Sequence, residues 1–213
     1  MPHVVTCFLR HRTHVLLARR NDAVGTDAGR WAGISGSVEG DPADAEADAR
    51  REIREETGVE SATLVRVGDP LDVRDGDRTW TVHPFLFEVG SRDIDPNEGL
   101  DAHEWASPPA IHDRETVPGL WNAYVAVAPT VETVAADGTH GSAWISVRAL
   151  EVLRDRAAVA GTADAVVAVA RDLRAVRPSM AAVAHRGNRG VAGAGRAPRA
   201  DRGRAERAAG GAP

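Results

Sequence analysis

Three glutamates lie close together in the segment Arg51-Glu52-Ile53-Arg54-Glu55-Glu56-Thr57-Gly58-Val59. At about 100° per residue, a helix places Glu52, Glu55 and Glu56 within an arc of roughly 100° on one face. Like charges at these spacings repel one another by a few tenths of a kcal/mol per pair unless a cation lies on them. Because carboxylate oxygens are hard ligands, the cluster predicts a site for Mg²⁺ or Mn²⁺ rather than for zinc.

The residues around the glutamates predict the helix that carries them. Asp41 suits the N-cap position and Pro42 the first helical position, while Gly58 stands where a left-handed residue ends a helix. Arg51 is spaced to reach Glu55 at i+4 and to orient its carboxylate. A stripe of small and apolar residues would hold the helix against a sheet: Ala45, Ala49 and Ile53. The alternative is a solvated acidic helix whose arginines neutralise its acids.

Other parts of the chain predict a sheet followed by helices. Apolar runs predict a hairpin over residues 4–10 and 14–19, and further strands over residues 31–38, 62–67, 71–74 and 79–89. Acidic loop residues lead from there to Glu104-Trp105. From about residue 116 the apolar spacing becomes helical, which predicts a domain boundary near residues 112–117.

Residues 51–59 resemble the second half of the Nudix hydrolase box, whose pattern is Gly-x5-Glu-x7-Arg-Glu-U-x-Glu-Glu-x-Gly-U with U aliphatic. The resemblance extends over roughly residues 3–112. It implies an α/β fold, an α/β/α sandwich around a mixed sheet. We therefore expect a Nudix domain over residues 1–114, a small all-helical module over residues 115–184 and a disordered tail over residues 185–213.

The first half of the box departs from the pattern. Counting back from Arg51, the expected Glu and Gly fall on Ala43 and Ser37. A shortened loop would leave Asp41 or Glu39 to replace the missing acid, and the sequence does not choose between them.

The resemblance implies hydrolysis of a phosphoanhydride bond in a nucleoside diphosphate linked to another moiety. Glu52, Glu55 and Glu56 would hold the divalent ions, with the Gly36 carbonyl as a further ligand. Glu52 is the first choice for ligand or general base, and Glu104 is a second candidate base. The alternative is a catalytically weak Nudix fold that binds a nucleotide or sugar phosphate in a regulatory or scaffolding role.

Several arginines could grip phosphates or merely solvate strand ends: Arg19, Arg20, Arg74 and Arg78. Substrate choice in such a fold resides in loops and strand faces, such as residues 21–30 and 90–103.

The helical part carries a second, shorter resemblance. Residues 140–143 (His-Gly-Ser-Ala) and 177–180 (Arg-Pro-Ser-Met) resemble the N-terminal region of the translation initiation factor 2B alpha subunit and sugar-phosphate isomerase family. No Rossmann-like domain follows, so one hypothesis is a truncated form of a longer protein. A helical packing or dimerisation module is the alternative, and a homodimer would be compatible with it.

Composition limits the remaining function classes. The chain has 213 residues, a net charge of -5, arginine as its only strongly basic residue type and one cysteine. Cys7 lies in an apolar run, which predicts a small buried side chain. The N-terminus lacks a secretory pattern and no stretch approaches a membrane span, so we expect a cytoplasmic protein. The arginine-rich tail has no aromatic residue to stack on bases, so we do not expect nucleic acid as a partner.

Overall fold

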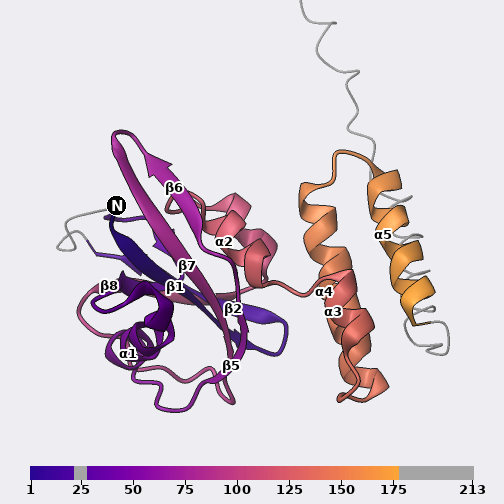
Figure 1. Cartoon of the computed structure of the whole chain (residues 1–213), viewed down its shortest axis with the longest axis horizontal. Helices are drawn as coiled ribbons and strands as arrows, with labels where there is room; N and C mark the ends of the chain where they lie inside the picture. The colour runs from indigo at the N-terminus through magenta and orange to yellow at the C-terminus, as the bar shows by residue number, and fades with distance from the viewer. Residues whose placement is uncertain (22–27, 178–213) are drawn as a thin grey trace, which may run out of the picture.

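The computed structural model describes residues 1–21 and 28–177. One mixed sheet lies between α1 on one face and α2 on the other, and α3 to α5 pack beside this sandwich (Figure 1). The strands are β1 (His3–His11), β2 (His14–Arg20), β3 (Trp31–Ala32), β4 (Ile34–Ser37), β5 (Thr63–Val67), β6 (Leu71–Asp75), β7 (Arg78–Glu88) and β8 (Leu100–Ala106). The helices are η1 (Pro42–Asp44), α1 (Ala45–Thr57), η2 (Pro108–Asp113), α2 (Leu120–Val127), α3 (Val131–Ala136), α4 (Ser142–Val159) and α5 (Ala163–Val176). The predicted α/β fold is confirmed.

Strand β1 organises the sheet. It pairs antiparallel with β2 and β4 and parallel with β7, and β7 in turn pairs with β5 and β6. The predicted hairpin of β1 and β2 is confirmed. The predicted third strand is interrupted, because Gly33 passes so close to β1 that a Cβ there would lie 2.9 Å from the Cys7 carbonyl oxygen. This approach separates β3 from β4.

One strand was not predicted from the sequence. Residues 100–103, expected in a loop, are part of β8, which pairs antiparallel with β2. Its side chains alternate between exposed and half-buried, and several are polar. Pairing with the apolar β2, rather than local propensity, therefore forms this strand.

Alternation along β1 divides the core into two layers. Val5, Cys7 and Leu9 pack with the buried face of α1, whereas Phe8 packs with α2. Cys7 is fully buried, as predicted, and burial raises the pKa of its thiol well above the ordinary value. The two layers therefore fix α1 on one face of the sheet and leave the other face to α2.

The helices predicted after residue 116 are confirmed, and α3, α4 and α5 share a core of their own. Helix α2, although it follows residue 114, packs against the sheet. The boundary between residues 114 and 115 stays a prediction. No described helix is long and apolar enough to cross a membrane. The predicted disordered tail over residues 185–213 lies outside the described residues.

Polar contacts attach α4 to the sandwich. Arg148 Nη2 donates to the Arg12 carbonyl at 2.9 Å, and Arg154 Nη1 donates to the Thr13 carbonyl at 2.9 Å. The buried Tyr124 hydroxyl of α2 donates to Asp155 Oδ2 at 2.8 Å. The turn between β1 and β2 and one face of α2 therefore hold the helical part in place.

Candidate active site

Local sequence sets both ends of the helix that carries the glutamates. The Asp41 side chain accepts a hydrogen bond from the Ala43 backbone N–H at 2.9 Å, and Pro42 begins the 3-10 turn η1 that leads into α1. Gly58 ends α1 with φ 67°, and its N–H donates to the Arg54 carbonyl at 2.9 Å. The predicted N-cap and C-terminal glycine are confirmed.

The buried stripe of α1 turns its acidic face toward β4. Ala45, Ala49 and Ile53 are buried against the sheet, as predicted. Glu52 then lies directly against Gly36, where a Cβ would collide with the Glu52 carboxyl group. Only glycine therefore leaves room for this carboxylate beside the strand.

Arg51 joins the acids at the start of this face. Its guanidinium lies 2.7 Å from Glu39 Oε1, 3.1 Å from Asp48 Oδ1 and 2.9 Å from Glu52 Oε1. Among the described residues, Arg51 forms ion pairs with these three acids and not with Glu55, so the structure does not show the expected contact between Arg51 and Glu55. Glu39 and Asp41 were the two candidates to replace the glutamate missing from the first half of the Nudix box. Glu39 forms an ion pair with Arg51, whereas Asp41 caps η1.

Glu56 is the most perturbed carboxyl group of the three. Burial raises its pKa to about 7, and Glu52 and Glu55 add to the shift, although Arg20 and a hydrogen bond to the Ser35 backbone oppose it. Burial also raises the pKa of Glu52, and Arg51 opposes that shift. Burial thus disfavours the ionised forms of Glu52 and Glu56 more than the neighbouring arginines favour them.

The donor set suits a hard divalent cation. The three glutamates contribute carboxylate oxygens from one helix face, and burial, followed by repulsion from the neighbouring glutamates, raises the pKa values of Glu52 and Glu56. Within residues 1–21 and 28–177, however, no three acidic, histidine or cysteine side chains converge closely enough to hold a metal ion as they stand. The chemistry of the donors fits Mg²⁺ or Mn²⁺, and the side chains would have to reorient toward the ion.

Glu104, the second candidate base, is not brought to this cluster. It pairs with Leu17 across β2 and β8, and Leu17 belongs to the layer on the α2 face of the sheet. Both Glu104 carboxylate oxygens accept hydrogen bonds from Arg114 Nη2 at 2.6 Å. The expectation that Glu104 shares a site with Glu52 is therefore not met, because the sheet lies between them.

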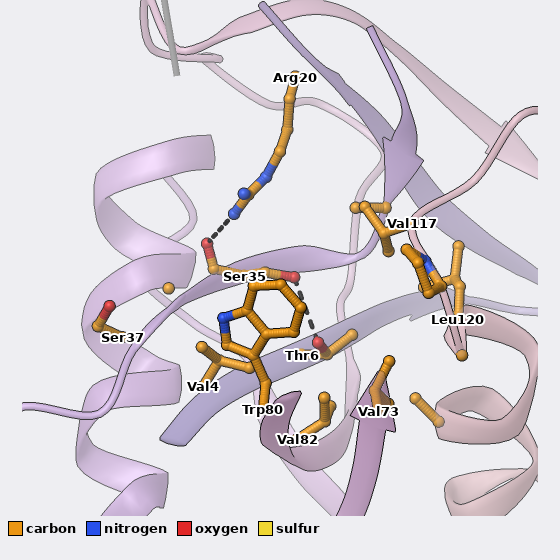
Figure 2. A pocket seen from close by; sticks show the side chains of 15 residues that line it. Val4, Thr6, Arg20, Ser35, Ser37, Val73, Trp80, Val82, Val117 and Leu120 are labelled. Carbon is orange, nitrogen blue, oxygen red and sulfur yellow. Dashed lines mark hydrogen bonds between the residues drawn. The ribbon is translucent and has the colours of Figure 1, made fainter. Parts of the chain in front are cut away.

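A cavity of about 190 Å³ opens beside Gly36 on the other side of β4. Figure 2 shows Arg20 extending toward Ser35, to whose carbonyl it donates at 3.1 Å, with Trp80, Val82 and Val73 lining the wall below. Val117 and Leu120 close a further side. The cavity is thus polar next to the box and apolar further away from it.

Sequence reasoning missed most of this lining. It assigned substrate choice to loops and strand faces such as residues 21–30 and 90–103, and residues 22–27 lie outside the described chain. Strand faces do line the cavity, but at other residues, and further lining comes from residues 117–120 and 123, which the sequence assigned to the following module. One residue could have indicated this cavity from the sequence: Trp80, a large aromatic residue between two threonines in a predicted strand.

The NUDIX domain family matches residues 1–127 of the chain. The chain belongs to the Nudix family. It is a hydrolase of the class that acts on phosphorus-containing acid anhydrides, as predicted. Because the match ends at residue 127, the resemblance of the later residues to initiation factor 2B subunits is not confirmed.

Comparison with solved structures finds proteins that are similar to part of this chain. The MutT protein from Methanosarcina mazei Go1 is 23% identical, covers 58% of this chain and 88% of its own, and has a TM-score of 0.48. The E. coli ORF135 protein is 27% identical over 59% of this chain and 89% of its own, with a TM-score of 0.46. No curated protein matches the chain.

The close approach of Gly36 to the Glu52 carboxyl group can be tested by substitution. Gly36→Ala should displace the Glu52 carboxyl group, which is the movable end of a side chain, and leave the backbone in place. We expect hydrolysis to fall by roughly tenfold or more, since misplaced catalytic groups cost about this much, while the melting temperature changes little. Steady-state kinetics and thermal unfolding of the same preparation measure both quantities. Unchanged kinetics would show that the Glu52 position does not matter.

Glu56 makes the stability of the metal-free Nudix domain depend on pH. Its folded pKa of about 7 lies above the ordinary value, so the folded state favours the protonated acid and loses stability as pH rises through 7. We expect Glu56→Gln to remove a penalty on the order of 2 kcal/mol at pH 8 and to have little effect at pH 4.5. Urea unfolding in chelator at the two pH values measures the difference. A Glu56→Gln effect that is equal at both would contradict the assigned shift.

Proposed function

We propose that the protein hydrolyses a phosphoanhydride bond in a nucleoside diphosphate linked to another moiety, with Mg²⁺ or Mn²⁺ as cofactor. The observation that carries the proposal is the acidic face of α1 against Gly36. Burial, and to a smaller extent the neighbouring glutamates, raise the pKa values of Glu52 and Glu56 there, and a divalent cation would favour the ionised carboxylates.

The residues of the box have distinct proposed roles. Glu52, Glu55 and Glu56 would hold the metal, with the Gly36 carbonyl as a further ligand. Glu52 would also accept the proton of the attacking water, since its pKa is raised by burial and Arg51 fixes its orientation. When bound, the metal would supply charge neutralisation of the diphosphate and a more acidic water.

The cavity beside Gly36 supports a nucleoside-type substrate. Its apolar wall includes the Trp80 indole, on which a flat base can stack, and Arg20 lies at the polar end beside the box. A substrate with a flat organic group on one side of a diphosphate would span both ends. The carboxylates beyond β4 would hold the metal beside the diphosphate of such a substrate.

A panel of substrates tests the proposal. Nucleoside di- and triphosphates, nucleotide sugars and dinucleotides would be incubated with the protein and Mg²⁺, and products would be identified by phosphorus NMR. We expect one class to be turned over into two phosphate-bearing products and chelator to abolish turnover. Metal-independent binding without turnover across the panel would instead support the regulatory alternative.

A further inference from the structure

A second and larger cavity separates the sheet from the helical part. Its volume is about 730 Å³, and its walls come from β1, β5 and β7 on one side and from α3, α4 and residues 137–140 on the other. It lies away from Gly36 and shares no lining residue with the cavity beside the box. A volume of this size suits a small organic ligand.

Three arginines from different elements line this cavity. Arg10 comes from β1, Arg66 from β5 and Arg148 from α4. Burial lowers the pKa values of Arg66 and Arg148, and repulsion from the positive charge of Arg10 adds to both shifts. Bringing them together costs free energy that an anion between them would recover.

Arg148 is the deepest of the three and is incompletely satisfied. Its side chain is 6% exposed, and its Nε–H has no hydrogen-bond acceptor among the described residues. Nη2 is taken by the Arg12 carbonyl, while Nη1 lies 2.9 Å from Glu151 Oε2. A buried N–H without an acceptor costs free energy, so the Nε–H of Arg148 is a donor that still lacks an acceptor.

The described acids around the cavity pair with only two of the three arginines. Glu88 pairs with Arg10 at 2.6 Å and Glu151 pairs with Arg148. Asp137, the other acid of the lining, accepts from the backbone of Thr139 and His140. Among the described residues, Arg66 has no ion-pair partner and donates only to the Ala128 carbonyl, at 3.0 Å. Arg66 and the Nε–H of Arg148 therefore remain available to an anion.

The aromatic side chains of the cavity favour recognition of the anion over recognition of a base. His140 stacks on Trp144 with ring centroids 3.8 Å apart, and Arg148 lies 5.0 Å from the Trp144 centroid. Because His140 and Arg148 already contact the Trp144 indole, stacking of a ligand base on this ring would add little to the affinity. Planar guanidinium groups match the oxygens of a phosphate better than those of a neutral ligand.

We propose that this cavity binds a small phosphorylated molecule, whose phosphate is held by Arg66 and Arg148 at the junction of the sheet and the helical part. Binding would bridge β5 and α4 and so tie the two parts together. The site does not depend on the box carboxylates or on a metal.

The test uses the full chain in chelator, so that metal-dependent binding at the box is removed. Ribose 5-phosphate, AMP and inorganic phosphate are titrated separately by calorimetry, with ribose as the uncharged probe. We expect one phosphorylated ligand to bind per chain and ribose not to bind. Inorganic phosphate that binds as tightly as the organic phosphates would show that the phosphate alone is recognised, and weaker binding would show that the rest of the ligand contributes.

Variants separate this site from binding elsewhere. Arg66→Gln should weaken affinity by at least about tenfold, because a charged hydrogen-bond partner is lost, and Arg148→Met tests the second donor if that variant folds. Arg156→Gln changes an exposed arginine of the same helix and should leave affinity within about twofold. Absence of binding by all three phosphates at millimolar concentration, or affinity unchanged in Arg66→Gln, would overturn the proposal.

Discussion

Replacing Glu55 and Glu56 together by glutamine should lower kcat/KM for the phosphoanhydride substrate by roughly 10³-fold. Glutamine keeps the size of each side chain and removes the charge that would hold a divalent cation. Because Glu56 has a pKa raised to about 7 mainly by burial, the variant should fold at least as well as the native protein. Loss of activity with retained stability would separate a functional role from a structural one.

Glu60→Gln provides the matched control for this variant. Glu60 is an exposed acid just beyond the end of α1, so its replacement makes the same chemical change without touching the acidic face. We expect its kcat/KM to remain within about twofold of the native value, as for most surface substitutions. Equal losses in the control and the double variant would mean that net charge, and not the box, limits activity.

Arg148→Met should lower the free energy of unfolding by about 3–5 kcal/mol, because it breaks a buried ion pair and leaves one charge behind. Arg148 and Glu151 are 5% and 3% exposed, respectively. Burial raises the pKa of Glu151 to about 6 even with Arg148 beside it. Without the arginine, this acid must bind a proton or unfold part of α4. Urea unfolding at pH 7 measures the change.

The double variant Arg148→Met/Glu151→Leu distinguishes charge from packing. Replacing both partners by apolar residues removes the unpaired acid, so most of the lost stability should return. A double variant as unstable as Arg148→Met would assign the effect to the lost Arg12 contact and to packing on Trp144 instead.

Local patterns predicted the helix of the box and most of the sheet. Asp41, Pro42 and Gly58 determine their own backbone geometry within a few residues, and the stripe of Ala45, Ala49 and Ile53 needs only helical periodicity. Such features depend on nearest neighbours in the chain, which a single sequence displays.

Features that depend on distant partners were not predictable in this way. The strand β8 forms because β2 offers an edge, and the side on which Glu104 projects follows from pairing with Leu17. Arg51 pairs with Glu39, Asp48 and Glu52 because the loop before α1 folds back onto the helix. A sequence alone does not show this fold of the loop, so Glu55 was expected as the partner. Trp80 and Leu120 meet at one cavity although forty residues of chain separate them.

Direct measurement of Mn²⁺ binding tests the central claim that the acidic face of α1 is a divalent metal site. Calorimetry or electron paramagnetic resonance would compare the native protein with the Glu55→Gln/Glu56→Gln variant at pH 8, without substrate. We predict saturable binding to the native protein and a loss of at least about tenfold in affinity for the variant. Equal affinity in the two proteins, or no binding to either, would contradict the account.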